Sequence, residues 1–211
     1  MNRSQKTYAG RETVVAYETE LAGSPALVLR EAEALYDGQG RLRRTYERLS
    51  MRLGELGIGF GLVSGFAVFA HGLRRFTEDL DVLTTGDGLN TIGDRLVGHG
   101  YTTVAGTPSS IRDAETGVRI DFVLAGAYPG DGKPKPVAFP DPSVAEEHDG
   151  LRVVDLKTLI ELKLASGMTG RGRLQDLADV QRLIAEHGLG ETYAARLHPY
   201  VRAKFLELCH S

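Results

Sequence analysis

Two aspartates separated by a single residue, Asp79 and Asp81, are the strongest chemical feature of the sequence. The apolar residues around them predict a β-strand, in which side chains at i and i+2 point to the same face. Two carboxylates held side by side repel each other, which raises the pKa of one of them or demands a cation. Because hard divalent cations prefer oxygen ligands, this spacing favours a Mg²⁺ site, with Mn²⁺ as a second option.

A third acid, Asp121, stands in the middle of the predicted strand 118–124. An aspartate among large apolar residues is unfavourable in a buried strand unless its charge is compensated. If this strand lies beside the strand of Asp79 and Asp81, the three carboxylates converge on one metal site. If the sheet is instead open on one side, Asp121 simply faces solvent.

A turn at Ser64 and Gly65 precedes a short apolar helix that Gly72 is expected to end. Backbone N–H groups and the positive end of the helix dipole meet at such a turn, and both attract anions. The predicted anion site is therefore followed directly by the predicted cation ligands Asp79 and Asp81. Together they could hold a metal-bound triphosphate.

This unit resembles the polymerase-β-like nucleotidyltransferase superfamily, whose signature is a Gly-Gly or Gly-Ser turn followed by an Asp-x-Asp strand. It is similar to the motifs of a small bacterial branch, the AbiEii-type toxins and their relatives, at Gly65, Ala67, His71-Gly72 and the run 75–81. Ser64 stands where that branch usually has its first glycine. The resemblance implies a nucleoside triphosphate as substrate, Mg²⁺ as cofactor, and Asp121 as the third acid of the site.

The C-terminal part of the chain contains two further segments, 162–165 and 171–179, that resemble the Lys-x-x-Ala and Arg-Asp-x-x-Asp segments of the same family. A lysine supplies a mobile positive charge for triphosphate oxygens, so Lys163 is predicted to bind the nucleotide. Asp176 and Asp179, three residues apart, share a helix face and could orient that lysine or approach the nucleotide. Without the resemblance, these residues would be interpreted as ordinary charges on a helix surface.

The composition is that of a soluble globular protein, with 42% hydrophobic and 25% charged residues in 211. No apolar run approaches the length of a membrane span, and the first residues lack the apolar centre of a signal peptide, so we expect a cytoplasmic protein without a membrane partner. Cys209 is the single cysteine, which excludes a disulfide within the chain.

Nucleic acid is not attracted by the molecule as a whole, because the net charge is −3 and the pI is about 6.1. A local stripe remains, since Arg41, Arg44, Arg48 and Arg52 lie on one face of a predicted helix over 41–56. The stripe could contact an RNA backbone, or it could be a solvated face paired with neighbouring glutamates.

The order of predicted elements indicates an α/β (α+β) fold, in which helices flank a small mixed sheet and a C-terminal α-helical domain follows. We expect an N-terminal arm and helix over 1–40 and the nucleotidyltransferase core over 41–125. An irregular connector, rich in proline and glycine, is expected over 126–150, and the helical domain over 151–211.

Two functions of different classes follow from these patterns. The first is a metal-dependent nucleotidyltransferase that moves a nucleoside monophosphate from a triphosphate to a hydroxyl of RNA, a protein or a small molecule, as a stand-alone enzyme or as the toxin of a toxin–antitoxin pair. The alternative is a non-catalytic, antitoxin-like module that keeps the fold and binds a nucleotide or a partner protein. The presence of all three acids favours the enzyme.

Overall fold

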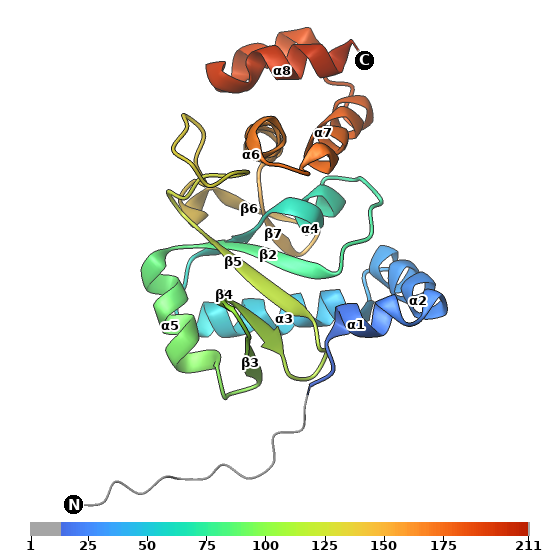
Figure 1. Ribbon diagram of the computed structural model, residues 1–211, viewed down its shortest axis with the longest axis vertical. Helices are drawn as coiled ribbons and strands as arrows, with labels where there is room; N and C mark the ends of the chain where they lie inside the picture. The colour runs from blue at the N-terminus through green and yellow to red at the C-terminus, as the bar shows by residue number, and fades with distance from the viewer. Residues whose placement is uncertain (1–13, 211) are drawn as a thin grey trace, which may run out of the picture.

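The computed structural model describes residues 14–210, so residues 1–13 of the predicted N-terminal arm lie outside the described part. Within this part, one seven-stranded mixed sheet separates two groups of helices (Figure 1). The predicted fold class, a mixed sheet flanked by helices and followed by a helical C-terminal region, is confirmed. The strands are β1 (Phe60–Leu62), β2 (Asp79–Thr84), β3 (Tyr101–Val104), β4 (Thr107–Asp113), β5 (Arg119–Leu124), β6 (Ala145–His148) and β7 (Leu151–Val154). The helices are α1 (Tyr17–Ala22), α2 (Pro25–Tyr36), α3 (Gly40–Glu55), α4 (Ser64–Ala70), α5 (Gly86–Leu96), α6 (Leu156–Thr169), α7 (Leu174–Glu186) and α8 (Pro199–Cys209), with 3-10 turns η1 (Pro142–Val144) and η2 (Glu191–Arg196).

The strands follow the order β3-β4-β5-β2-β1-β7-β6 across the sheet. The pairs β2/β5 and β1/β7 are parallel, and the other neighbours are antiparallel. Strand β6 lies in the segment expected to be an irregular connector, and β7 opens the segment expected to be helical. Both strands belong to the same sheet as β1 and β2, so the sheet extends beyond the span expected for the core.

One face of the sheet is covered by α3 and α5, where apolar side chains recur at helical spacing. Leu49 and Leu53 of α3 and Ile92 of α5 pack there against Leu80 and Val82 of β2, and all five are fully buried or nearly so. The arginine stripe lies on an adjacent side of α3, where Arg41, Arg48 and Arg52 are partly exposed. Ion pairs from Arg41, Arg48 and Arg52 to glutamates or aspartates occupy much of it, which agrees with a solvated, paired face.

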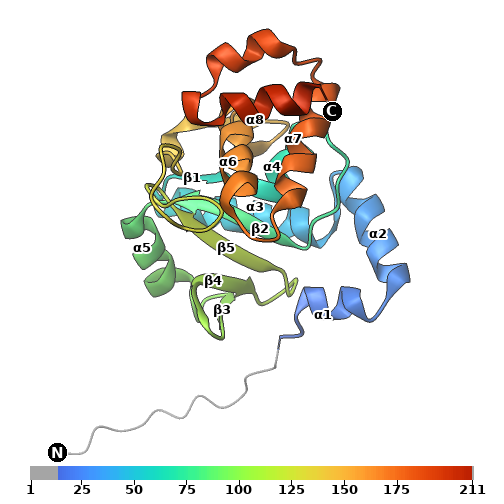
Figure 2. The same ribbon diagram turned by 45° about the horizontal axis from the view of Figure 1, so that its top comes forward.

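The other face of the sheet is covered by α4 and the C-terminal helices, and α8 crosses over α6 and α7 (Figure 2). The second core lies there, and its members include Leu83 of β2, Ala67 of α4, Leu159 of α6, Val180 of α7 and Phe205 of α8. Because side chains alternate along β2, Asp79 and Asp81 share a face with Leu83 rather than with Leu80 and Val82. The two aspartates thus lie between the sheet and the C-terminal helices.

Candidate active site

The third acid, Asp121, lies directly beside Asp81, because the two residues are register partners on the parallel strands β2 and β5. Paired residues of neighbouring strands are about 5 Å apart at the backbone and point to the same face. Asp79 lies two positions earlier on β2, on the same face. All three line a single cleft of about 360 Å³.

Each carboxylate has a hydrogen-bond donor within this part of the fold. The hydroxyl of Thr77 donates to Asp79 Oδ1 over 3.1 Å, and the hydroxyl of Ser64 donates to Asp81. Asp121 Oδ1 accepts from Arg119 Nε at 2.8 Å and also from the hydroxyl of Ser110. Asp121 is thereby the one acid of the three with a cation bound directly to it.

The electrostatics of the pair on β2 are unfavourable. Burial raises the pKa of Asp81 to about 7, and the charges of Asp79 and Asp121 act in the same direction. The pKa of Asp79 is also raised, mainly by burial, although the hydrogen bond from Thr77 acts against it. A carboxylate pair with raised pKa values gains from a neighbouring cation, so this part of the cleft favours a positive ligand.

The turn at Ser64 and Gly65 begins α4 and is tied to the acids through the backbone, since the N–H of Val63 donates to the carbonyl of Asp81 at 3.0 Å. Ser64 has a φ of 57°, a left-handed conformation that glycine adopts without strain and serine does not. Gly65 has no room for a side chain, because a Cβ would lie 2.8 Å from the Thr77 hydroxyl. The turn is therefore packed closely on the segment that leads into β2.

Lys163 and Asp176 lie beside the cleft, but Lys163 is buried rather than free in it. Its Nζ donates to Asp176 Oδ1 at 2.9 Å and to Asp179 Oδ2 at 2.8 Å, and its side chain is 4% exposed. Burial alone would raise the pKa of Asp176, but Lys163, the Ser166 hydroxyl and Arg173 together outweigh this effect and the pKa is lowered. The lysine and the two acids form a compact ionic cluster between α6 and α7.

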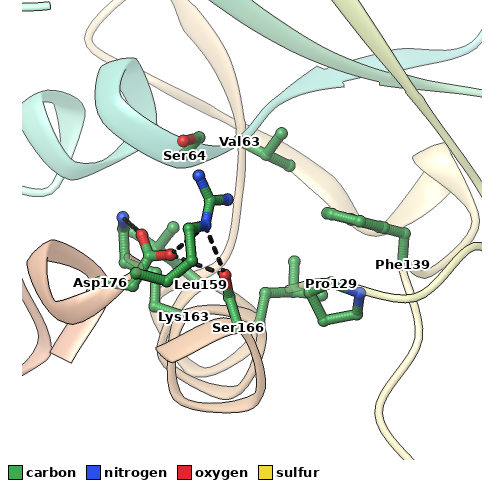
Figure 3. Close-up of a pocket in the computed structure, with 10 residues that line it drawn as sticks. Val63, Ser64, Pro129, Phe139, Leu159, Lys163, Ser166 and Asp176 are labelled. Atoms are coloured by element: carbon green, nitrogen blue, oxygen red, sulfur yellow. Dashed lines mark hydrogen bonds and ion pairs between the residues drawn. The ribbon is translucent and has the colours of Figure 1, made fainter. Parts of the chain in front are cut away.

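A small pocket of about 40 Å³ separates this cluster from the connector. Ser64 lines both the pocket and the cleft, and so does Arg173. Figure 3 shows Lys163 and Asp176 on one side of the pocket and Phe139 on the other, with Ser64 above. Ser64, Lys163 and Asp176, predicted nucleotide-binding residues that are far apart in the sequence, therefore line one pocket.

Of two further arginines in the site, the sequence left Arg75 open between a role at the triphosphate and a solvated side chain, and it assigned no role to Arg173. Arg75 lines the cleft and forms an ion pair with Asp179 at 3.5 Å. Arg173 bonds the hydroxyl of Ser166 and the carboxylate of Asp176, both at 3.0 Å. Both lie inside segments singled out from the sequence, but sequence spacing does not distinguish an arginine in a cleft from one in solvent.

Phe139 was also not predicted, and no motif in the sequence marks it. It lines both the cleft and the small pocket. Its position depends on how the segment 126–150 folds, which neither helical nor strand periodicity describes.

The donor chemistry of Asp79 and Asp81 fits a hard divalent cation such as Mg²⁺ or Mn²⁺, because both offer carboxylate oxygens in an environment that disfavours uncompensated negative charge. Within residues 14–210, no group of three His, Cys, Asp or Glu side chains is already arranged around a common metal position. Asp121 lines the same cleft, and its Oδ1 is bound by Arg119. The same residues contain no helix with the length and apolar character that a membrane crossing needs.

No family model matches the sequence, and no curated protein matches it. Among solved structures, the chain is similar to the antibiotic-resistance factor ANT(2'')-Ia, with 14% identity and a TM-score of 0.46 over 78% of this chain and 92% of that one. JHP933 from Helicobacter pylori has 20% identity and a TM-score of 0.40 over 72% of this chain and 71% of its own. A candidate nucleotidyltransferase from H. pylori has 19% identity and a TM-score of 0.38 over 65% and 66%.

These similarities concern the general course of the chain. The resemblance to nucleotidyltransferases, including the narrower AbiEii-type branch, stays a prediction from the sequence motifs.

Proposed function

We propose that the protein is a metal-dependent nucleotidyltransferase, which transfers a nucleoside monophosphate from a nucleoside triphosphate to a hydroxyl group and releases pyrophosphate. The observation that carries the proposal is the pairing of Asp81 with Asp121 on neighbouring parallel strands, with Asp79 on the same face. Residues far apart in the sequence thereby supply three carboxylates to one cleft that also contains arginines.

Asp79 and Asp81 would hold the cation, Mg²⁺ or Mn²⁺, through their carboxylate oxygens. When bound, the ion would neutralise charge on the triphosphate. Asp121 would accept the proton of the attacking hydroxyl. It is held ready for this by Arg119 and Ser110, whose release would let its oxygen turn toward the acceptor.

The triphosphate would lie against the turn of Ser64 and Gly65 and the guanidinium groups of Arg75 and Arg173. Arginine suits this task, because its planar fork of donors matches phosphate oxygens. The bond that breaks joins the α-phosphorus to the oxygen bridging it to the β-phosphorus, and the new bond joins the α-phosphorus to the acceptor oxygen. Positive charge at the arginines would stabilise the leaving pyrophosphate.

Lys163 and Asp176 would act in nucleotide binding chiefly as positioning residues. The ammonium of Lys163 is occupied by two carboxylates, and these same carboxylates also pair with the arginines of the cleft: Asp179 with Arg75, and Asp176 with Arg173. The buried cluster would thus fix both arginines at the distance the triphosphate requires. The positive charge of Lys163 also acts against the rise in the pKa of Asp81 that burial causes.

The test is release of pyrophosphate from each of the four ribonucleoside triphosphates in the presence of Mg²⁺, with total RNA, a protein lysate or an aminoglycoside as acceptor. We expect one combination to react, and the isosteric change Asp81→Asn to reduce the rate at least about 100-fold. Asp94→Asn, at an exposed position of α5, is the matched control and should leave the rate unchanged. Equal rates for both variants would refute the proposed role of Asp81.

The alternative is a non-catalytic module, and the engagement of Asp121 by Arg119 is the observation that favours it. In that case the protein would bind a nucleotide or a partner protein and release no pyrophosphate with any acceptor. Nucleotide binding without turnover in the same assay, unchanged by Asp121→Asn, would decide for the module.

RNA as acceptor, and a role as the toxin of a toxin–antitoxin pair with an antitoxin as partner, are finer proposals that the AbiEii-like motifs support. The ion pairs of the arginine stripe on α3 leave it poorly suited to an RNA backbone. An RNA end would therefore have to be bound at the cleft itself, and modification of end-labelled RNA is the direct assay.

A further inference from the structure

Phe139 is the only aromatic side chain among the described residues that line the cleft and the small pocket beside it. Seven of its partners in the cleft wall are charged or hydroxyl-bearing residues, and Val123 is the one other large apolar side chain. The site therefore has a single flat, apolar surface next to the groups that would hold a triphosphate.

The backbone of Phe139 is fixed to the strand that carries Asp121. Its N–H donates to the carbonyl of Ala127, and its carbonyl accepts from the N–H of Gly126, both at 2.8 Å. Residues 125–127 continue directly from β5, so the backbone of Phe139 is anchored next to the strand that carries Asp121 and Val123.

The loop between these residues is docked on the C-terminal end of α6. Gly130 lies so close that a Cβ there would be 2.9 Å from the carbonyl oxygen of Ser166. The ammonium of Lys135 closes the loop by donating to the carbonyl of Pro129 at 2.6 Å and to Asp131 at 2.7 Å. The connector, expected to be ordered but irregular, therefore forms one wall of the site.

We propose that Phe139 is the stacking platform for the nucleobase of the triphosphate, an inference that rests on the function proposed above. The small pocket, at about 40 Å³, has room for a few water molecules but not for a base, so the base would lie on the cleft side of the ring. Nucleobases stack on aromatic rings through their π-faces, whichever base is present. The surface is therefore tolerant of base identity and favours the larger purines.

The experiment compares two ligands of the full chain in the presence of Mg²⁺: ATP, which has a base, and inorganic tripolyphosphate, which has none. Phe139→Leu keeps apolar bulk but removes the ring, and we expect it to weaken ATP binding about 5- to 30-fold and to leave tripolyphosphate affinity within about twofold. Phe139→Leu should weaken CTP binding less than ATP binding. Phe139→Tyr, which keeps an aromatic ring, should bind ATP as the wild type does. Tyr128→Leu is the matched control. It also removes an aromatic ring from this loop, but the Tyr128 ring lines neither the cleft nor the small pocket.

The outcomes separate this inference from the proposed function. Unchanged ATP affinity in Phe139→Leu, or an equal loss for ATP and tripolyphosphate, overturns the stacking role while wild-type nucleotide binding stands. A change confined to the KM of the acceptor would show that the ring contacts the acceptor. This outcome also overturns the stacking role. If the wild type binds neither ligand, the proposed function fails, and the stacking role fails with it.

Discussion

The carboxyl group of Asp81 is buried in the cleft, and burial makes its charged form unfavourable for the stability of the fold. It lies beside Asp79 and opposite Asp121, and the resulting pKa of about 7 means that burying the charged form is unfavourable. The folded state therefore holds this proton more tightly than the unfolded chain, in which the pKa is 3.8. Its contribution to stability is complete below about pH 4 and is lost as the pH rises through 7.

Asp81→Asn is accordingly expected to raise the melting temperature of the metal-free protein at about pH 8. The asparagine carries no charge and can still accept the hydrogen bond from Ser64, so only the unfavourable ionisation is removed. The gain over wild type should shrink toward about pH 5, where the wild-type carboxyl is protonated. Thermal unfolding in EDTA at both pH values measures it, with Asp94→Asn as the control; a variant less stable than wild type at the higher pH would contradict the argument.

Asp179 is fully buried and accepts hydrogen bonds from Lys163 and Gln175, in addition to its ion pair with Arg75. Asp179→Asn would remove one of the two carboxylates that bind the buried Lys163 ammonium and the ion pair to Arg75, and we expect it to lower the free energy of unfolding by about 2–4 kcal/mol. Glu207→Gln, which breaks the exposed pair with Lys204, should change it by less than about 0.5 kcal/mol. Urea unfolding measures the loss in both variants. Equal losses would show that the buried ion pairs of Asp179 do not stabilise the fold more than an exposed pair does.

At the level of single residues, the three predicted acids line one cleft, but local patterns determine the relative position of only two of them. The i, i+2 spacing alone places Asp79 and Asp81 on one face of a strand. The neighbourhood of Asp81 and Asp121 depends on parallel pairing of two strands that other elements separate in the chain, which local patterns do not encode. The burial of Lys163 depends likewise on how α6 meets α7.

Among the elements, the connector departs most from what its composition suggests. Its prolines and glycines predict irregular backbone, and its Phe139 and Pro129 nevertheless line the site. The reason is that hydrogen bonds of the loop run to β5 and to its own side chains rather than to a regular partner strand. The amphipathic helix α3, expected over 41–56, was predicted closely, because its apolar spacing is a local property.

Two glycines of the connector test whether its docking matters. Gly130 and Gly132 both have positive φ, at 78° and 71°, so alanine strains the backbone equally at either position. Only Gly130 lacks space for a Cβ, whereas Gly132 has no neighbour within 4 Å. We expect Gly130→Ala to lower the free energy of unfolding by about 2–4 kcal/mol and Gly132→Ala by about 1 kcal/mol. Urea unfolding measures the difference, and equal losses would show that the loop is not held against α6.

For the molecule as a whole, the sheet carries a core on each face, and the cleft lies where the second core gives way to charged residues. A cation bound there would stabilise the folded state only, because the unfolded chain has no such site. MgCl₂ should therefore raise the melting temperature of the wild type at about pH 8, and Asp81→Asn should remove most of this rise. A sodium chloride series of equal ionic strength separates binding from screening, and an equal response of both proteins would exclude the site.

The cleft and the small pocket beside it draw their residues from α4, β2, β5, the connector, α6 and the start of α7, so these parts leave the ribosome at widely separated times. A nascent chain that has released both acid-bearing strands still lacks Arg173 and the ionic cluster that fixes it. The proposed site is therefore completed only late in translation. A chain truncated before α7 is expected to be inactive, even if its first strands have folded.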